Sequence, residues 1–141
     1  MVTDRYGHKI YPIGDYTDGF KNCLDKWWSK DTKEMDILMI QGRCDSCKTS
    51  ATFSWAYSSR ISAYRAYDTY EDWSGYNRED IVILDHSDIG AIKMTNLLKK
   101  IQMDGVRKVI VIIGTDFKHG DFRYDDTPKW FKDRSCLFTT G

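Results

Sequence analysis

One short segment of the chain carries the residue types that could do chemistry. The segment DILMIQGRCDSCKT, which ends at Thr49, runs from apolar residues into a glycine, two cysteines and a lysine. Gly42 begins the spacing G-x-x-x-x-C-K-T, which differs at one position from the phosphate-binding loop G-x-x-x-x-G-K-[ST]. Cys44 and Cys47, followed by Lys48, also have the C-x-x-C spacing of redox-active thiols. The segment therefore predicts either a nucleotide site or a thiol site.

Both kinds of site depend on the same physics at the end of a strand. A strand that leads into a helix N-terminus presents free backbone N–H groups and the positive end of the helix dipole. These groups stabilise a phosphate in a phosphate loop and a thiolate in a redox pair. In the first case Lys48 would meet the phosphates and Thr49 would hold Mg²⁺. In the second case Cys44 would attack and Cys47 would complete the disulfide.

Zinc is a third interpretation of the cysteines, and the sequence gives it less support. Cys44 and Cys47 have the spacing of one zinc-binding pair. The remaining ligands would have to be drawn from residues that share no paired spacing: Cys23, Cys136, His86 and His119. We therefore expect no zinc site, and we interpret Cys23 and Cys136 as small core residues.

Three apolar runs predict the strands that position this segment. They show no alternation between apolar and polar residues, which is typical of strands buried on both faces: Met35–Gln41, Asp80–Asp85 and Lys108–Ile113. Apolar residues at helical spacing predict three helices: Thr17 or Asp18 to Lys30, Thr49 to about Tyr64, and Gly90 to Met103. Residues 1–16 are expected to form an extended arm or short strands.

This order of elements predicts the fold class. Buried strands separated by helices indicate a three-layer α/β sandwich, with a mainly parallel central sheet and helices on both faces. A length of 141 residues is typical of a single domain with a substantial core. For a phosphate loop, the strand that ends at Asp85 should lie beside the strand that leads into Gly42. The third strand, followed by Thr115 and Asp116, would carry a polar sensor.

The chain resembles the superfamily 3 helicase domain of replication initiator (Rep) proteins from small circular DNA viruses and plasmids. The resemblance is carried by short blocks between Thr17 and Phe138: QGRCDSCKT, DWSGYNREDIVILDH, VIVIIGTDF and the late pair Asp133-Arg134. It implies a P-loop NTPase fold and a role in DNA replication. ATP and Mg²⁺ are the implied cofactors, and the implied partners are nucleic acid, a host or viral protein, or further copies of the chain.

The resemblance also implies roles for individual residues. The nucleotide would be bound by four residues of the loop and helix start: Gly42, Cys47, Lys48 and Thr49. Thr49 and Asp85 would hold Mg²⁺, and Asp116 or Thr115 would sense the γ-phosphate. Three positions depart from the family pattern: Cys47 replaces a glycine, His86 replaces a second acid, and Thr115 or Asp116 replaces an asparagine. These departures predict impaired ATP hydrolysis.

Two other functions remain open from the sequence. The segment GVRKVIVII is similar to a segment of thioredoxin, with Ile110 in place of that family's cis-proline and Arg43 in place of its tryptophan before Cys44. This likeness implies thiol-disulfide exchange by Cys44 and Cys47. Alternatively, the aromatic residues between Phe53 and Tyr76 could form the surface of a non-catalytic viral or phage accessory protein.

The charge balance favours no class of partner. Twenty-one basic and 21 acidic side chains cancel, so no overall field attracts nucleic acid or a membrane surface. A local basic patch could still form, although a solvated helix face is the simpler interpretation: Lys93, Lys99, Lys100, Arg107 and Lys108. No apolar run approaches membrane-spanning length. We expect a cytoplasmic location, or a nuclear one for a protein of a eukaryotic virus.

Overall fold

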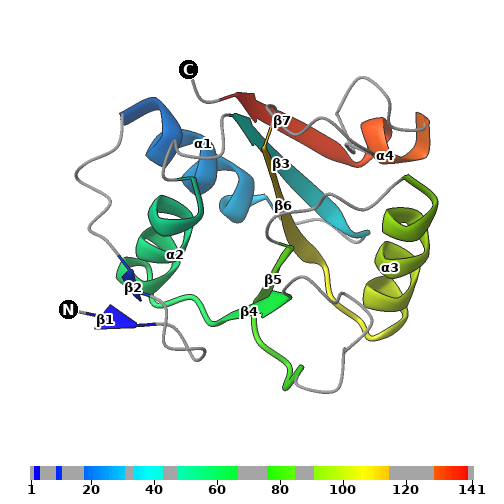
Figure 1. The fold of residues 1–141 in the computed structure, drawn as a ribbon, viewed down its shortest axis with the longest axis horizontal. Helices are drawn as coiled ribbons and strands as arrows, with labels where there is room; N and C mark the ends of the chain where they lie inside the picture. The colour runs from blue at the N-terminus through cyan, green and yellow to red at the C-terminus, as the bar shows by residue number, and fades with distance from the viewer. Residues whose placement is uncertain are drawn as a thin grey trace.

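Five parallel strands form the centre of the protein (Figure 1). The structure, a computed structural model, describes residues 2–3, 9–10, 18–30, 34–42, 48–66, 76–84, 91–114 and 129–139. Across the sheet the strands follow the order β4 (Ala63–Ala66), β5 (Ile81–Leu84), β6 (Lys108–Gly114), β3 (Asp36–Gly42) and β7 (Ser135–Thr139). A separate antiparallel pair, β1 (Val2–Thr3) and β2 (Lys9–Ile10), belongs to the N-terminal part.

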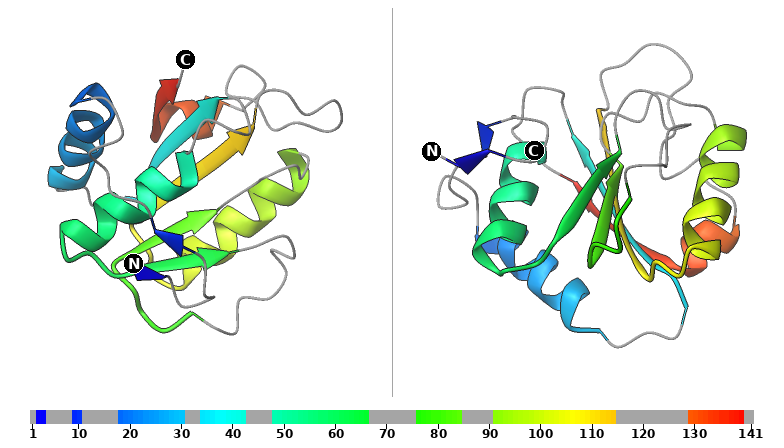
Figure 2. Two further views of the ribbon diagram at one scale, coloured as in Figure 1. Left: turned by 60° about the vertical axis from the view of Figure 1, so that its left-hand side comes forward. Right: turned by 90° about the horizontal axis from the view of Figure 1, so that it is seen from below.

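Helices cover both faces of this sheet. Figure 2 shows α1 (Asp18–Ser29) and α2 (Lys48–Ser58) on one side and α3 (Ala91–Met103) and α4 (Lys129–Asp133) on the other. Alternate residues of each central strand therefore pack in opposite directions. In β3, Leu38 and Ile40 belong to the core cluster of α1 and α2, while Ile37 and Met39 belong to that of α3 and α4. The predicted three-layer α/β fold is confirmed.

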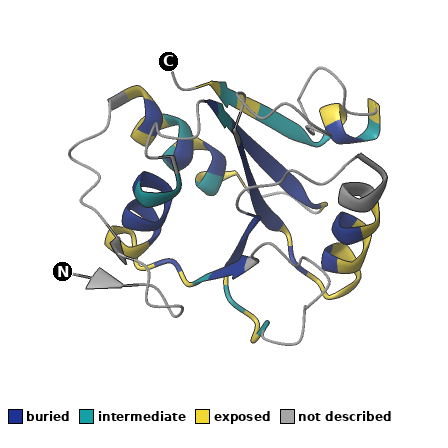
Figure 3. Ribbon diagram, in the orientation of Figure 1, coloured by how far each residue is buried: buried dark blue, intermediate teal, exposed yellow. Residues whose placement is uncertain are grey.

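Burial on both faces explains why the strand sequences do not alternate. Ile37, Leu38, Met39 and Ile40 are all fully buried, and Figure 3 shows that the central strands are buried along most of their length. The middle of a parallel strand between two helical layers has no solvent face, so consecutive positions there are apolar. The three predicted strands correspond to β3, β5 and β6, each within a residue or two of the expected ends.

The predicted helix from Thr49 to about Tyr64 is too long. The helix α2 ends at Ser58, and Arg60 follows with a positive φ of 57°. Tyr64 is buried in β4, a strand that the apolar spacing did not reveal. The error arose because Ile61 and Tyr64 continue the helical spacing while they belong to the turn and the strand. Tyr57, which also has the helical spacing of the apolar residues Phe53 and Ile61, is 61% exposed.

The expected neighbour of β3 is also wrong. We expected β5, the strand that precedes Asp85, to lie directly beside β3. Instead β6 lies between them, pairing with β3 on one side and with β5 on the other. Sequence spacing does not determine the lateral order of parallel strands, because helical crossovers can span one or several positions.

A buried ion pair is present at the amino ends of β3 and β6. The Nζ of Lys108 lies 3.1 Å from Oδ2 of Asp36 and donates a hydrogen bond to the carbonyl oxygen of Trp27 at 2.7 Å. It also lies 5.1 Å from the centre of the Trp27 ring. Lys108 is therefore excluded from the basic surface patch that its sequence neighbours allowed.

Candidate functional site at the carboxyl edge of the sheet

Two glycines meet at the carboxyl edge of the sheet. The strands β3 and β6 pair in register from Asp36 opposite Lys108 to Gly42 opposite Gly114. Neither glycine carries a side chain, so a ligand can approach the backbone closely at this point. Residues 43–47 and 115–120, which continue from these glycines, lie outside the described residues.

The next described elements after these two neighbouring strands lie on opposite faces of the sheet. After β3 the next described element is α2, which packs on the α1 side; after β6 it is α4, which packs on the α3 side. In open parallel sheets, ligands bind in the crevice that forms outside the carboxyl ends of strands with diverging connections. The topology therefore indicates a ligand site beside Gly42 and Gly114.

The helix α2 is fixed firmly at this edge. Residues 51–56 are all buried, and β2 packs alongside the helix. The Trp55 ring lies 6.4 Å from the Trp27 ring, and its Nε1 donates a hydrogen bond to Oδ1 of Asp25 at 2.9 Å. The N-terminus of α2 is therefore held in place by packing along the body of the helix.

The start of α2 has the electrostatic character of an anion site. The helix begins at Lys48, and its first turn contains no acidic residue. The unpaired N–H groups of this turn and the helix dipole attract negative charge, which is typically worth about 0.3–1 kcal/mol at an exposed terminus. Thr49, the second residue of the helix, is partly exposed. A phosphate or a thiolate would be stabilised here.

The described part of β5 reaches a lower level of the sheet than β3 and β6 do. Leu84, the last residue of β5, is level with Val111, whereas Gly114 lies three residues further along β6. At 3.3 Å per residue this difference is about 10 Å. The residue that follows Leu84, Asp85, lies outside the described residues.

The described residues contain part of the predicted site. Gly42 ends β3, and Lys48 and Thr49 open α2, so these three residues lie at the same edge. The other predicted site residues lie outside the described residues: Cys44, Cys47, Asp85, Asp116, Thr115 and His86.

Of the residues expected for a thioredoxin-like site, Ile110 is described, whereas Cys44 and Cys47 lie outside the described residues. Ile110, which takes the place of the cis-proline, lies in the middle of β6, opposite Leu38 and Ile83. It is four residues from Gly114, which corresponds to about 13 Å along the strand. The described part of the chain contains no cis peptide bond. Ile110 is therefore a buried core residue, well below the edge from which residues 43–47 leave.

Neither a metal cluster nor a membrane span is found among the described residues. No group of three or more His, Cys, Asp or Glu side chains in this part of the chain could hold a metal ion. None of its helices is both long and apolar enough to cross a membrane.

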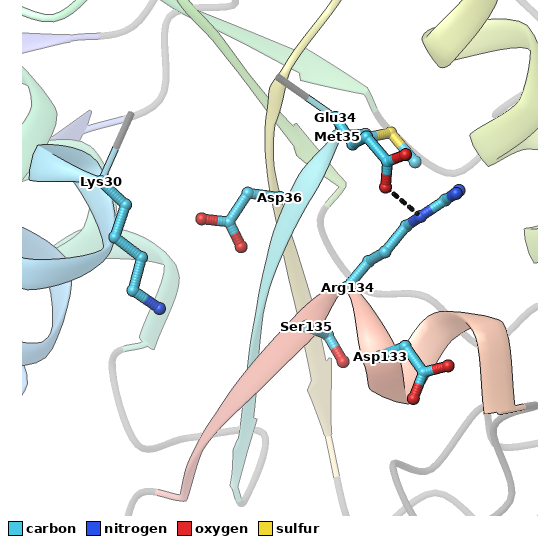
Figure 4. Close-up of a pocket in the computed structure, with 7 residues that line it drawn as sticks. All are labelled: Lys30, Glu34, Met35, Asp36, Asp133, Arg134 and Ser135. Carbon is cyan, nitrogen blue, oxygen red and sulfur yellow. Dashed lines mark ion pairs between the residues drawn. The ribbon is translucent and has the colours of Figure 1, made fainter. Parts of the chain in front are cut away.

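A pocket of about 530 Å³ lies at the opposite, amino edge of the sheet (Figure 4). Two basic, three acidic and two uncharged residues line it: Lys30, Arg134, Glu34, Asp36, Asp133, Met35 and Ser135. Arg134 belongs to the pair Asp133-Arg134 of the family resemblance, and its Nε lies 3.2 Å from Oε2 of Glu34. The sequence did not predict this pocket, because its charged residues come from separate segments and form no motif.

Comparison with known proteins gives no family assignment. A scan against protein-family models found no match, and a search of curated proteins found no relative.

Proposed function

We propose that the protein is a P-loop NTPase-like protein that binds a nucleoside triphosphate and resembles the superfamily 3 helicase domain of viral and plasmid Rep proteins. One observation carries this proposal. Gly42 ends a buried strand at the point where the strand connections diverge, and the helix that follows begins at Lys48, the sixth residue after it. A phosphate loop requires this order of elements, with a strand before the loop and a helix directly after it.

In the proposed complex the phosphates lie at the N-terminus of α2. Their charge meets the free N–H groups of the first turn, and the ammonium group of Lys48 meets the β- and γ-phosphates. The hydroxyl of Thr49 is one ligand of Mg²⁺. Because α2 is held by its buried residues, little ordering of the helix is needed when the nucleotide binds.

Asp85 follows a strand that lies two positions from β3. Two strand spacings correspond to about 10 Å, which is the lateral separation of β5 from β3. Mg²⁺ normally keeps several of its waters and is bound through one or two carboxylates. We therefore assign Asp85 a contact with the Mg²⁺ hydration shell.

Slow hydrolysis is part of the proposal. A Cβ at Cys47 occupies space where the loop backbone should approach the phosphates. His86 supplies no carboxylate to activate the attacking water, and Thr115 or Asp116 takes the place of the sensor amide. In this proposal the binding of the nucleotide, and not its rapid hydrolysis, controls the activity of the protein.

The test is a thermal-shift titration with Mg-ATP, with and without reductant. At a nucleotide concentration of about 100 times Kd, binding adds about 2.7 kcal/mol to the stability of the folded state, which corresponds to a rise in Tm of roughly 5 to 10 °C. Lys48→Ala should abolish this rise. Lys99→Ala is the matched control, because Lys99 is an exposed lysine on α3, on the far face of the sheet.

Two results would contradict the proposal. An identical Tm with and without Mg-ATP in the parent protein would remove its basis. Rapid phosphate release would contradict slow hydrolysis while leaving nucleotide binding intact. Rapid alkylation of Cys44 near neutral pH, together with a reversible Cys44–Cys47 disulfide, would favour the thiol function.

A further inference from the structure

A second pair of cysteines lies between α1 and the edge strand β7. The two elements are in direct contact, because the rings of Phe20 and Phe138 pack edge to face with centres 5.1 Å apart. The other end of α1 lies at the amino edge of the sheet, where the carbonyl of Trp27 accepts a hydrogen bond from Lys108. The helix α1 therefore runs antiparallel to β7.

This antiparallel arrangement brings Cys23 and Cys136 to the same level. Cys23 lies one helical turn after Phe20, about 4.5 Å further along α1. Cys136 lies two residues before Phe138, on the same face of β7 and about 6.6 Å back along the strand. Both displacements point toward the amino edge. Both side chains are half-buried against the same core cluster, and neither forms a disulfide in the structure.

The electrostatics agree with this proximity. Burial raises the pKa of the Cys23 thiol and that of the Cys136 thiol. The pKa of Cys136 is raised further by Cys23, which is therefore near enough to repel a thiolate there. Lys30 acts in the opposite direction on both thiols. Each group is thus held as a neutral thiol near neutral pH, and a higher pH releases the thiolate.

We propose that Cys23 and Cys136 are a dithiol pair that forms a disulfide between α1 and β7 under oxidising conditions. The oxidant is a small disulfide such as oxidised glutathione. One cysteine thiolate attacks it, forming a mixed disulfide and releasing one glutathione thiolate. The second cysteine then attacks the mixed disulfide, so that a Cys–Cys bond forms and a second glutathione leaves. Two protein S–H bonds are lost and two reduced glutathione molecules are produced.

Two features of the fold favour a disulfide at this site. First, the described residues provide no third metal ligand near the thiols, so metal binding is not supported there. Second, β7 is an edge strand whose only partner among the described strands is β3. Cys23 and Cys136 are 113 positions apart in the sequence, and a cross-link that closes such a long loop strongly restricts the unfolded chain. Oxidation would therefore lock the last described strand onto the fold.

The experiment uses a chain with Cys44→Ser and Cys47→Ser, so that the loop cysteines cannot react. The folded protein is incubated with oxidised glutathione at about pH 8.5, where thiolates become available, and its peptides are mapped by mass spectrometry. We expect an intramolecular Cys23–Cys136 peptide, loss of two free thiols per chain, and a rise in Tm of roughly 10 °C that reductant reverses.

Controls make the outcome decisive. Removing the second thiol with Cys136→Ser should trap a stable glutathione adduct on Cys23, and Cys23→Ser should trap one on Cys136. If the chain with both thiols instead carries two glutathione adducts, or keeps both thiols free, the pair is too far apart and the proposal is wrong. Should the double serine variant fold poorly, peptide mapping of the unaltered chain gives the same distinction. None of these readouts depends on nucleotide binding.

Discussion

The ion pair between Lys108 and Asp36 provides a quantitative test of how β3 and β6 are held together. Only 10% of the Lys108 side chain and 11% of the Asp36 side chain are exposed. The substitution Lys108→Met retains an unbranched apolar stem but removes the ammonium group. It leaves the Asp36 carboxylate without its cation and removes the shorter of two hydrogen bonds to the carbonyl of Trp27, which still accepts one from the backbone N–H of Lys30.

The expected loss follows from this burial. Removing one member of a buried pair costs about 3–5 kcal/mol, because a charge is left in a poorly solvated site. The pair lies at the edge of the sheet and retains slight exposure, so we expect a value near the lower limit, about 3 kcal/mol. In urea unfolding this loss would appear as a lower midpoint with an unchanged slope.

A double substitution separates the charge effect from packing. Asp36→Leu in the Lys108→Met background removes the stranded carboxylate, so the double variant should recover at least half of the loss. A loss below about 1 kcal/mol for Lys108→Met would show that the pair is solvated or replaced by other contacts. A double variant as unstable as the sum of the two single variants would show that the two groups do not interact.

Three further predictions concern backbone conformation and pH. Gly105→Ala should destabilise the protein by about 1–2 kcal/mol in urea unfolding, because Gly105 has a φ of 84°, which strains any residue with a side chain. A Cβ there meets no atom within 4 Å, so no steric clash adds to this loss. Gly19→Ala should have the opposite sign and stabilise α1 by roughly 0.5 kcal/mol, since Gly19 is helical and equally uncrowded; a loss of stability would contradict this account. Hydrogen bonds from Lys21 and then Trp55 lower the pKa of Asp25. Its stabilising effect is therefore complete above the ordinary carboxyl pKa and lost as the pH falls below about 4. Asp25→Asn should lower Tm at pH 6, through a loss of about 1 kcal/mol or less of folding stability after solvent screening. Near pH 2 the substitution should have no such effect. Equal effects at both pH values would exclude the charge of the carboxylate as the cause.

The centre of the fold could be predicted because its strands are buried on both faces. Runs such as IVIL in β5 leave no solvent-facing position, so the apolar sequence itself marks the strand. The strand β4 is different: it lies at the edge of the sheet and has only four residues, AYRA, including Arg65. Its apolar residues also continued the spacing of the preceding helix, and that pattern concealed the strand.

The candidate site was predictable only in its local part. The spacing from Gly42 to Lys48 predicted a strand followed by a helix, and both lie where expected. The lateral order of the strands was not predictable, because it depends on how far each crossover carries the chain across the sheet. The proximity of Cys23 and Cys136 could not be predicted from the sequence either. It depends on the packing of α1 against β7, which the contact between Phe20 and Phe138 shows.

The strand order also affects how the chain is made. The strand β3 is synthesised early, but both of its neighbours, β6 and β7, come much later in the sequence. Asp36 and Lys108, which begin β3 and β6, are 72 residues apart. A ribosome that adds about 5–20 residues per second needs roughly 4 to 14 s to cover that distance. During that interval the apolar stretch from Ile37 to Ile40 has no native partner strand, so it is open to non-native pairing until β6 and β7 have been made.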